Sequence, residues 1–240
     1  MTIGVADLDA SRRFYETALG QLGVGEPTTD AHFSEWNDFS IAERREDRPV
    51  TRNLHVAFVA RSQGAVDEWW RAMTAAGHPN DGAPGPRPQY SPTYYGAFVR
   101  DPDGNSVEAV HHGEPREGEN HIDHLWIRVR NLDAQRRFWE TVAPTVGLGL
   151  HECGAPNHFH VTGGGRSFAL VREEPLTEHV QVAFPAADQA TVQEFHRVAL
   201  AAGFRDSGPP GERPVYHEGY YGAYVLDPDG NNVEAVFHDR

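Results

Sequence analysis

Residues 94–112 read YYGAFVRDPDGNSVEAVHH, and residues 220–238 read YYGAYVLDPDGNNVEAVFH. The two stretches lie 126 positions apart and agree at 15 of 19 positions. A second motif, LDASRRF at residues 8–14, recurs as LDAQRRF at residues 132–138. A period of about 125 residues has the size of a domain and is too long for a solenoid repeat. The chain therefore consists of two similar halves.

The boundary between the halves is predicted in residues 113–120, which read GEPREGEN. This polar run has no apolar face to bury, and its glycines and proline are typical of a linker. The predicted domains are residues 1–112 and 121–240. With 240 residues and 39% hydrophobic residues in the chain, each half is large enough for one core.

Each half is predicted to run strand, helix, several strands, and then the same order again. Apolar spacing predicts the first helix, capped by Asp9 or Ser11, and Gly77 ends the second. The helices of the first half are predicted at residues 9–19 and 63–76, and its strands at residues 2–6, 31–36, 39–43, 54–60, 94–100 and 105–111. Four similar units therefore make up the chain.

The sequence DPDG at residues 101–104 and 227–230 predicts the turn of a β-hairpin. Pro102 has the negative φ that the second position of a type I turn requires, and Gly104 can adopt the left-handed conformation before the return strand. This signal concerns structure alone and carries no chemistry.

Composition excludes several classes of protein. A net charge of −14 disfavours binding to nucleic acid or to anionic membranes, and no segment has 18 consecutive apolar residues. The start of the chain has no signal-peptide pattern, which predicts a cytoplasmic protein. All 21 basic residues are arginines, so lysine chemistry is excluded. The 14 histidines are the main candidates for chemistry near neutral pH.

Two glutamates lie in the middle of predicted strands, Glu108 in NSVEAV and Glu234 in NNVEAV. A carboxylate there needs a polar partner, a metal or water. By period-2 alternation, His55 faces away from its apolar neighbours in the strand at residues 54–60, and His124 does the same at residues 120–127. These residues are candidate metal ligands.

In these motifs the chain resembles the vicinal oxygen chelate superfamily of glyoxalases, extradiol dioxygenases, fosfomycin-type resistance enzymes and bleomycin-binding proteins. The first helix, the histidine-bearing strands and the DPDGNxVEAV hairpin carry the resemblance in both halves. It implies an α+β fold of four βαβββ modules, which form two tandem domains with cupped mixed β-sheets. It also implies a divalent metal in the cup, bound by a histidine from each of two strands and a glutamate after the DPDG turn.

The resemblance implies different ligands in the two halves. The second half offers His124, Glu234 and either His179 or Gln181, because Gln181 aligns with His55 and His179 lies two residues earlier. Two imidazoles and a carboxylate suit Fe(II), Mn(II), Ni(II) or Zn(II). The first half offers His55 and Glu108, and the residue that matches His124 would lie just upstream of Met1. We therefore expect weak metal binding or none in the first half.

The second half also resembles the extradiol dioxygenase signature, with a departure at Ala223. The resemblance makes His217 a candidate acid or base and Tyr224 a candidate hydrogen-bond donor. The candidate substrate-binding residues are Tyr216, Tyr220, Trp126 and Arg128. The alternative is that the tyrosines fill a half-buried strand face, and that Arg128 forms a buried ion pair with Glu234.

Two functions remain open. The favoured one is a metal-dependent enzyme of lyase or dioxygenase type that acts on a small oxygenated substrate. The alternative is a metal-free protein that binds or sequesters a small molecule in an aromatic-lined cup, as bleomycin-resistance proteins do. The partner in either case is a small molecule, and the superfamily also allows a homodimer.

Overall fold

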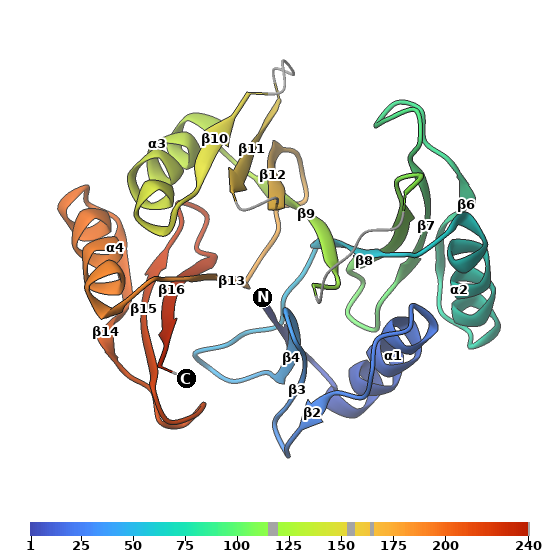
Figure 1. Cartoon of the computed structure of the whole chain (residues 1–240), viewed down its shortest axis with the longest axis horizontal. Helices are drawn as coiled ribbons and strands as arrows, with labels where there is room; N and C mark the ends of the chain where they lie inside the picture. The colour runs from blue at the N-terminus through green and yellow to red at the C-terminus, as the bar shows by residue number, and fades with distance from the viewer. Residues whose placement is uncertain (115–119, 153–156, 164–165, 240) are drawn as a thin grey trace. The chain divides into compact units, whose positions relative to one another are not determined.

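The computed structural model describes residues 1–114, 120–152, 157–163 and 166–239 (Figure 1). Of the predicted linker, residues 115–119 lie outside the described residues.

The predicted order of elements is confirmed, since the chain forms four successive βαβββ modules. The first is β1 (Thr2–Val5), α1 (Leu8–Gln21), β2 (Thr28–Thr29), β3 (Phe33–Trp36) and β4 (Phe39–Glu43). The second is β5 (His55–Val59), α2 (Gln63–Ala75), β6 (Asn80–Pro86), β7 (Tyr95–Arg100) and β8 (Ser106–His111). The third is β9 (Ile122–Val129), α3 (Leu132–Val142) with the short 3₁₀ helix η1 (Ala143–Val146), β10 (Gly149–His151), β11 (His158–Gly163) and β12 (Arg166–Arg172). The fourth is β13 (Val180–Pro185), α4 (Gln189–Ala201), β14 (Arg205–Glu212), β15 (Tyr220–Leu226) and β16 (Asn232–His238).

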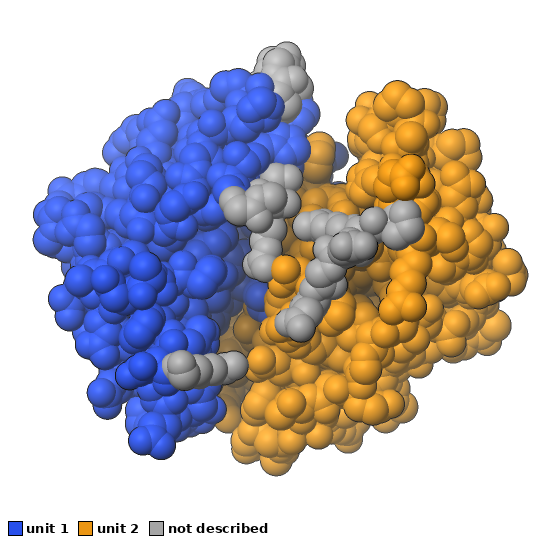
Figure 2. All heavy atoms as spheres, in the orientation of Figure 1, with its two compact units in different colours: residues 1, 127–240 blue, residues 2–126 orange. Residues whose placement is uncertain are grey.

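The chain divides into two compact units (Figure 2). Unit 1 comprises Met1 and residues 127–240, and unit 2 comprises residues 2–126. The division falls inside β9, so the first residues of that strand pack with the first half of the sequence. The domain bounds 1–112 and 121–240 stay a prediction.

The strands of unit 2 combine parallel and antiparallel neighbours. One group has the order β1–β4–β3–β2, in which β1 and β4 are parallel. The other has the order β9–β5–β8–β7–β6, in which β5 and β8 are parallel and the remaining pairs are antiparallel. Because β5 lies between β8 and β9, side chains from three strands can meet on one face of it.

Unit 1 repeats parts of this pattern. Strands β13 and β16 are parallel, and β15 and β14 extend that group by antiparallel pairing. Strands β10, β11 and β12 form an antiparallel meander. Mixed sheets with helices confirm the predicted α+β class.

The helices cover one face of the strands because each has a single apolar face. Helix α1 buries Phe14, Tyr15, Ala18 and Leu19. It begins earlier than the sequence predicted: Asp7 is the N-cap, and its side chain accepts a hydrogen bond from the backbone of Ala10. In the part of the chain that the structure describes, every helix is too short or too polar to cross a bilayer.

The DPDG turn has the predicted geometry, with φ of 85° at Gly104 and 95° at Gly230. Asn105 follows the first turn and is fully buried. Its Oδ1 accepts from the backbone N–H of Leu54 at 3.1 Å, and its Nδ2 donates to the backbone oxygen of Thr51 at 3.2 Å. These bonds tie the hairpin that carries Glu108 to the residue before His55.

We expect Asn105→Ala to lower the free energy of unfolding by about 2–3 kcal/mol, because it removes the side-chain acceptor of the buried backbone N–H of Leu54 and a donor to the backbone oxygen of Thr51. Urea denaturation measures this loss. Asn231→Ala is the matched variant, since Asn231 accepts from the backbone of Val180 at 3.2 Å in the same position of unit 1. A change below about 0.5 kcal/mol in Asn105→Ala, within the range of ordinary surface substitutions, would show that the hairpin does not depend on this residue.

Candidate metal centre

The register of three strands brings His55, Glu108 and His124 together in unit 2. Ala57 in the middle strand β5 is the partner of Glu108 in β8 on one side and of His124 in β9 on the other. Paired residues share a face of the sheet, and so do residues two positions apart, which adds His55. Ala57 is small and fully buried, so the three longer side chains have room above it.

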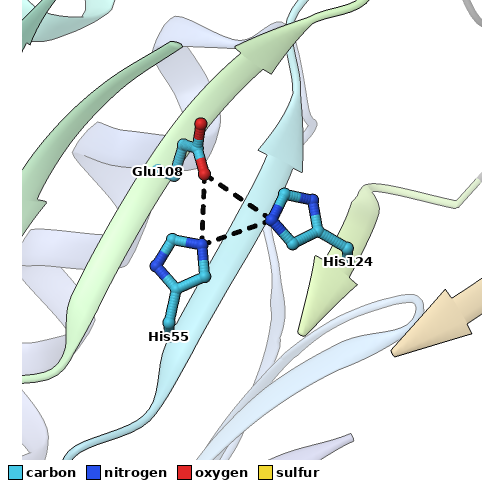
Figure 3. A group of neighbouring side chains, drawn as sticks. All are labelled: His55, Glu108 and His124. Carbon is cyan, nitrogen blue, oxygen red and sulfur yellow. Dashed lines mark hydrogen bonds and ion pairs between the residues drawn. The ribbon is translucent and has the colours of Figure 1, made fainter. Parts of the chain in front are cut away.

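The three side chains point at one another (Figure 3). Oε2 of Glu108 lies 3.1 Å from Nε2 of His55 and 3.7 Å from Nε2 of His124. The two imidazole Nε2 atoms are 3.3 Å apart. Glu108 is fully buried, whereas the side chains of His55 and His124 are 15% and 23% exposed. The group is therefore reached from the side of the histidines.

The other ring nitrogen of each histidine has an acceptor, which sets the tautomer. Nδ1 of His124 lies 2.8 Å from the carboxylate of Asp123, so Nδ1 carries the proton. Nδ1 of His55 lies 3.3 Å from Oγ of Ser106, and that hydroxyl donates to Asp81 at 2.8 Å. The Ser106 oxygen is thus left to accept from His55. Both Nε2 atoms then present lone pairs to the centre.

Glu108 adds a third acceptor. Its Oε1 accepts a hydrogen bond from Tyr94 at 2.7 Å. Its Oε2 is buried and accepts no hydrogen bond from the described residues, because its contacts with the histidines have the distance of an ion pair without the direction of a hydrogen bond. With both Nδ1 atoms protonated, three lone pairs face one another, and a cation between them would be stabilised by all three.

The donor set fits a divalent transition metal. Metal–donor bonds of about 2.0–2.2 Å place neighbouring donor atoms roughly 2.8–3.6 Å apart, close to the three distances seen here. Two histidines and one carboxylate on one side of a metal leave its remaining positions open. Among the described residues, this is the one group of three or more histidine, cysteine or acidic side chains close enough to hold a metal.

Burial and charge keep Tyr94 and Asp123 in the required protonation states. Burial raises the pKa of Tyr94 well above its usual value, and the charge of Glu108 raises it further, so Tyr94 remains a donor. Burial alone would raise the pKa of Asp123, but hydrogen bonds from His112 and His124 outweigh it and hold that pKa well below its usual value. Asp123 therefore remains an acceptor.

The corresponding residues of unit 1 have a different arrangement. Gln181 stands in the place of His55 and donates to Oε2 of Glu234 at 2.9 Å. Tyr220 donates to Oε1 of the same carboxylate. Burial raises the pKa of Glu234 despite these hydrogen bonds. Both oxygens of Glu234 thus accept hydrogen bonds from protein donors.

The residues that form hydrogen bonds behind His55 in unit 2 also differ in unit 1. Ser106, Asp81 and Arg100 form a chain in unit 2, in which Arg100 pairs with Asp81 at 2.7 Å. At an offset of 126, the residues of unit 1 at these three positions are Asn232, Ser207 and Leu226. The two halves have therefore diverged in the contacts around the glutamate as well as in one ligand.

The structure groups the predicted ligands differently from the sequence interpretation. His124 lies in unit 2 with His55 and Glu108, whereas His179, Gln181 and Glu234 belong to unit 1. His179 precedes β13 and has φ of 59°, so strand alternation does not extend to it. Unit 2 has three candidate metal ligands instead of the two expected for the first half, because β9 supplies His124.

The candidate catalytic residues of the second half are not part of this centre. His217 is half-buried, and its Nε2 lies 2.9 Å from Nδ1 of His238. Tyr224 is buried near Glu234, and burial followed by that charge raises its pKa. The centre in unit 2 contains neither of them.

The candidate substrate-binding residues are dispersed. Tyr216 is half exposed with its ring 4.8 Å from that of Tyr220. Trp126 is the register partner of His55 across the strands. Arg128 pairs with Glu173 at 3.3 Å, so the suggested ion pair with Glu234 is wrong.

Sequence reasoning missed several residues of the centre. Tyr94 and Gly96 lie in the segment that both halves share, and that repetition was a signal for them. Asp123 precedes His124 directly, which was a weaker signal. Asp81 lies 27 positions before Glu108, with no motif around it.

With this fold and site, the chain is a tandem α+β protein with a two-histidine, one-glutamate candidate metal centre. Residues 1–109 match the family described as Glyoxalase/Bleomycin resistance protein/Dioxygenase superfamily. No match to the chain is found among curated proteins.

Solved structures share the whole fold. Glyoxalase I from Zea mays superposes with a TM-score of 0.69 and 18% sequence identity, over 99% of this chain and 90% of that one. A proposed dioxygenase from Bacillus subtilis subsp. subtilis str. 168 gives a TM-score of 0.66 and 12% identity, over 100% of this chain and 84% of that one. At these identities the likeness establishes the fold, and the chemistry has to be argued from the residues.

We expect Gly96→Ala to weaken metal binding at least about 10-fold, the lower end of the loss seen when a ligand is mispositioned. An added Cβ would overlap Oε1 of Glu108 and lie 3.2 Å from the ring of Tyr94, so the carboxylate must move. Calorimetric titration of the folded variant measures the affinity. Gly222→Ala is the matched control, because its Cβ would lie 2.8 Å from Glu234 in unit 1 and should leave the affinity unchanged. Equal affinities in the wild type, Gly96→Ala and Gly222→Ala would contradict the assignment of Glu108 as a metal ligand.

Proposed function

We propose that the chain is a metal-dependent vicinal-oxygen-chelate enzyme of lyase or dioxygenase type, acting on a small oxygenated substrate. One observation carries the proposal: the Nε2 atoms of two histidines and a buried carboxylate oxygen converge to within 3.7 Å of one another, the spacing of ligand atoms around one metal ion. The match of residues 1–109 to the glyoxalase and dioxygenase superfamily supports it.

His55, Glu108 and His124 would hold the metal, which could be Fe(II), Mn(II), Ni(II) or Zn(II). When bound, such a metal supplies a Lewis acid that polarises substrate oxygens. Two neighbouring oxygens of a small molecule fit the positions that three protein ligands leave open. The same donor set is used by non-haem Fe(II) oxygenases, so dioxygenase activity is the first to assay.

The remaining residues hold this arrangement. Tyr94 donates to Oε1 of Glu108 and leaves Oε2 directed at the histidines. Asp123 and Ser106 fix the tautomers of the two histidines. The ring of Phe98 lies 5.8 Å from that of His55 and supplies an apolar wall beside this ligand. Together these residues present a preorganised set of donors that a substrate can approach.

The test is metal binding by the purified protein, followed by ligand variants. We expect one transition-metal ion per chain, and we expect His55→Ala, Glu108→Gln and His124→Ala each to weaken binding more than about 100-fold, beyond the loss typical of residues that merely support a ligand. Gln181→Ala and Glu234→Gln are the matched controls in unit 1, and both should keep the metal. Metal content is measured by elemental analysis and affinity by chelator competition.

A protein that binds no transition metal would contradict the proposal and favour the metal-free binding function. Loss of metal in the Glu234→Gln control, with retention in Glu108→Gln, would move the site to unit 1.

A further inference from the structure

The carboxylate of Asp123 lies between two histidines. Its Oδ1 is 2.8 Å from Nδ1 of His124 and 3.1 Å from Nε2 of His112. The side chain of Asp123 is 10% exposed, whereas that of His112 is 44% exposed. A chain of contacts thus runs from the surface through a half-buried carboxylate to one of the candidate ligands.

We propose that Asp123 and His112 are positioning residues for the metal centre: Asp123 fixes the tautomer and ring direction of His124, and His112 holds Asp123 in place. The inference rests on the proposed function, since it concerns how one ligand of that centre is held. It goes further by giving a role to an exposed histidine that does not touch the centre.

The contacts explain why both residues are needed. A carboxylate with so little exposure is costly to desolvate unless it accepts hydrogen bonds, and His112 supplies a second donor to the oxygen that His124 contacts. The ring of Tyr94 packs edge-on against that of His112 at 5.0 Å and lies 6.3 Å from that of His124. The imidazole of His112 is therefore packed as well as hydrogen-bonded.

The two ligand histidines have unequal support. His124 donates to a charged carboxylate at 2.8 Å, and His55 to a neutral hydroxyl at 3.3 Å. A carboxylate partner makes the imidazole a stronger donor to a metal, and charged hydrogen bonds are stronger than neutral ones. Loss of Asp123 should therefore weaken metal binding more than loss of Ser106.

Unit 1 provides matched controls. The counterpart of His112 is His238, which pairs with His217 at 2.9 Å. An aspartate–histidine pair of the same kind occurs at Asp206 and His196, which are 3.0 Å apart in unit 1. Neither pair adjoins the candidate ligands, so variants there test the general effect of removing such a contact.

The experiment measures the Zn(II) affinity of the full chain by chelator competition and the visible spectrum of the protein loaded with Co(II). We expect Asp123→Ala to weaken Zn(II) binding about 10- to 100-fold, the range for a residue that orients a metal ligand. Asp123→Asn, which keeps an acceptor oxygen, should lose less, as should His112→Ala and Ser106→Ala. The Co(II) spectrum should change in Asp123→Ala, and thermal unfolding of the metal-free protein should not.

Asp206→Ala and His238→Ala should bind Zn(II) as the wild type does. Wild-type affinity and spectrum in Asp123→Ala would overturn the inference while leaving the proposed function in place. An equal loss in Asp123→Ala and Asp206→Ala would also overturn it, since the effect would then be general. Wild-type affinity in His124→Ala would instead overturn the proposed function itself.

Discussion

The side chains of His55, Glu108 and His124 meet above Ala57, and neighbouring residues of unit 2 hold each of them in place. Ala57 has Glu108 as its partner on one side and His124 on the other. Each donor is fixed by a further contact: Tyr94 for Glu108, Asp123 for His124 and Ser106 for His55. Three lone pairs that face one another at this spacing repel unless a cation lies between them, and this constraint links the fold to the proposed chemistry.

The two halves of the chain show that the fold does not require the metal. Glu234 is as buried as Glu108, yet Gln181 and Tyr220 satisfy its oxygens. Gln181 replaces His55, and its amide N–H donates to Glu234 where the imidazole of His55 presents a lone pair to Glu108. The carboxylate of Glu234 is therefore satisfied without a cation. The same scaffold can therefore hold its mid-strand glutamate in two ways, one suited to metal binding and one to packing.

The sequence predicted most of the fold and part of the centre. The DPDG turns and the order of helices and strands follow from local spacing, the α+β class was implied by the resemblance to a known superfamily, and period-2 alternation pointed to His55, Glu108 and His124. It also placed His179 on a strand face, which the left-handed conformation of that residue excludes. Asp81 was not predictable, because its link to Ser106 and His55 depends on which strands become neighbours, and no local pattern records that.

The neighbour of β5 explains the grouping of the ligands. Parallel pairing of β5 with β8 stays within one repeat, since a helix and two strands between them give the length that a parallel connection needs. The other edge of β5 is taken by β9, which begins the next repeat. Sequence comparison of the halves therefore divides the chain before His124, whereas the candidate metal centre combines His124 with His55 and Glu108. The candidate centre thus extends beyond the repeat, and a fragment that ended at His112 would keep the DPDG hairpin and lose one of the three candidate ligands.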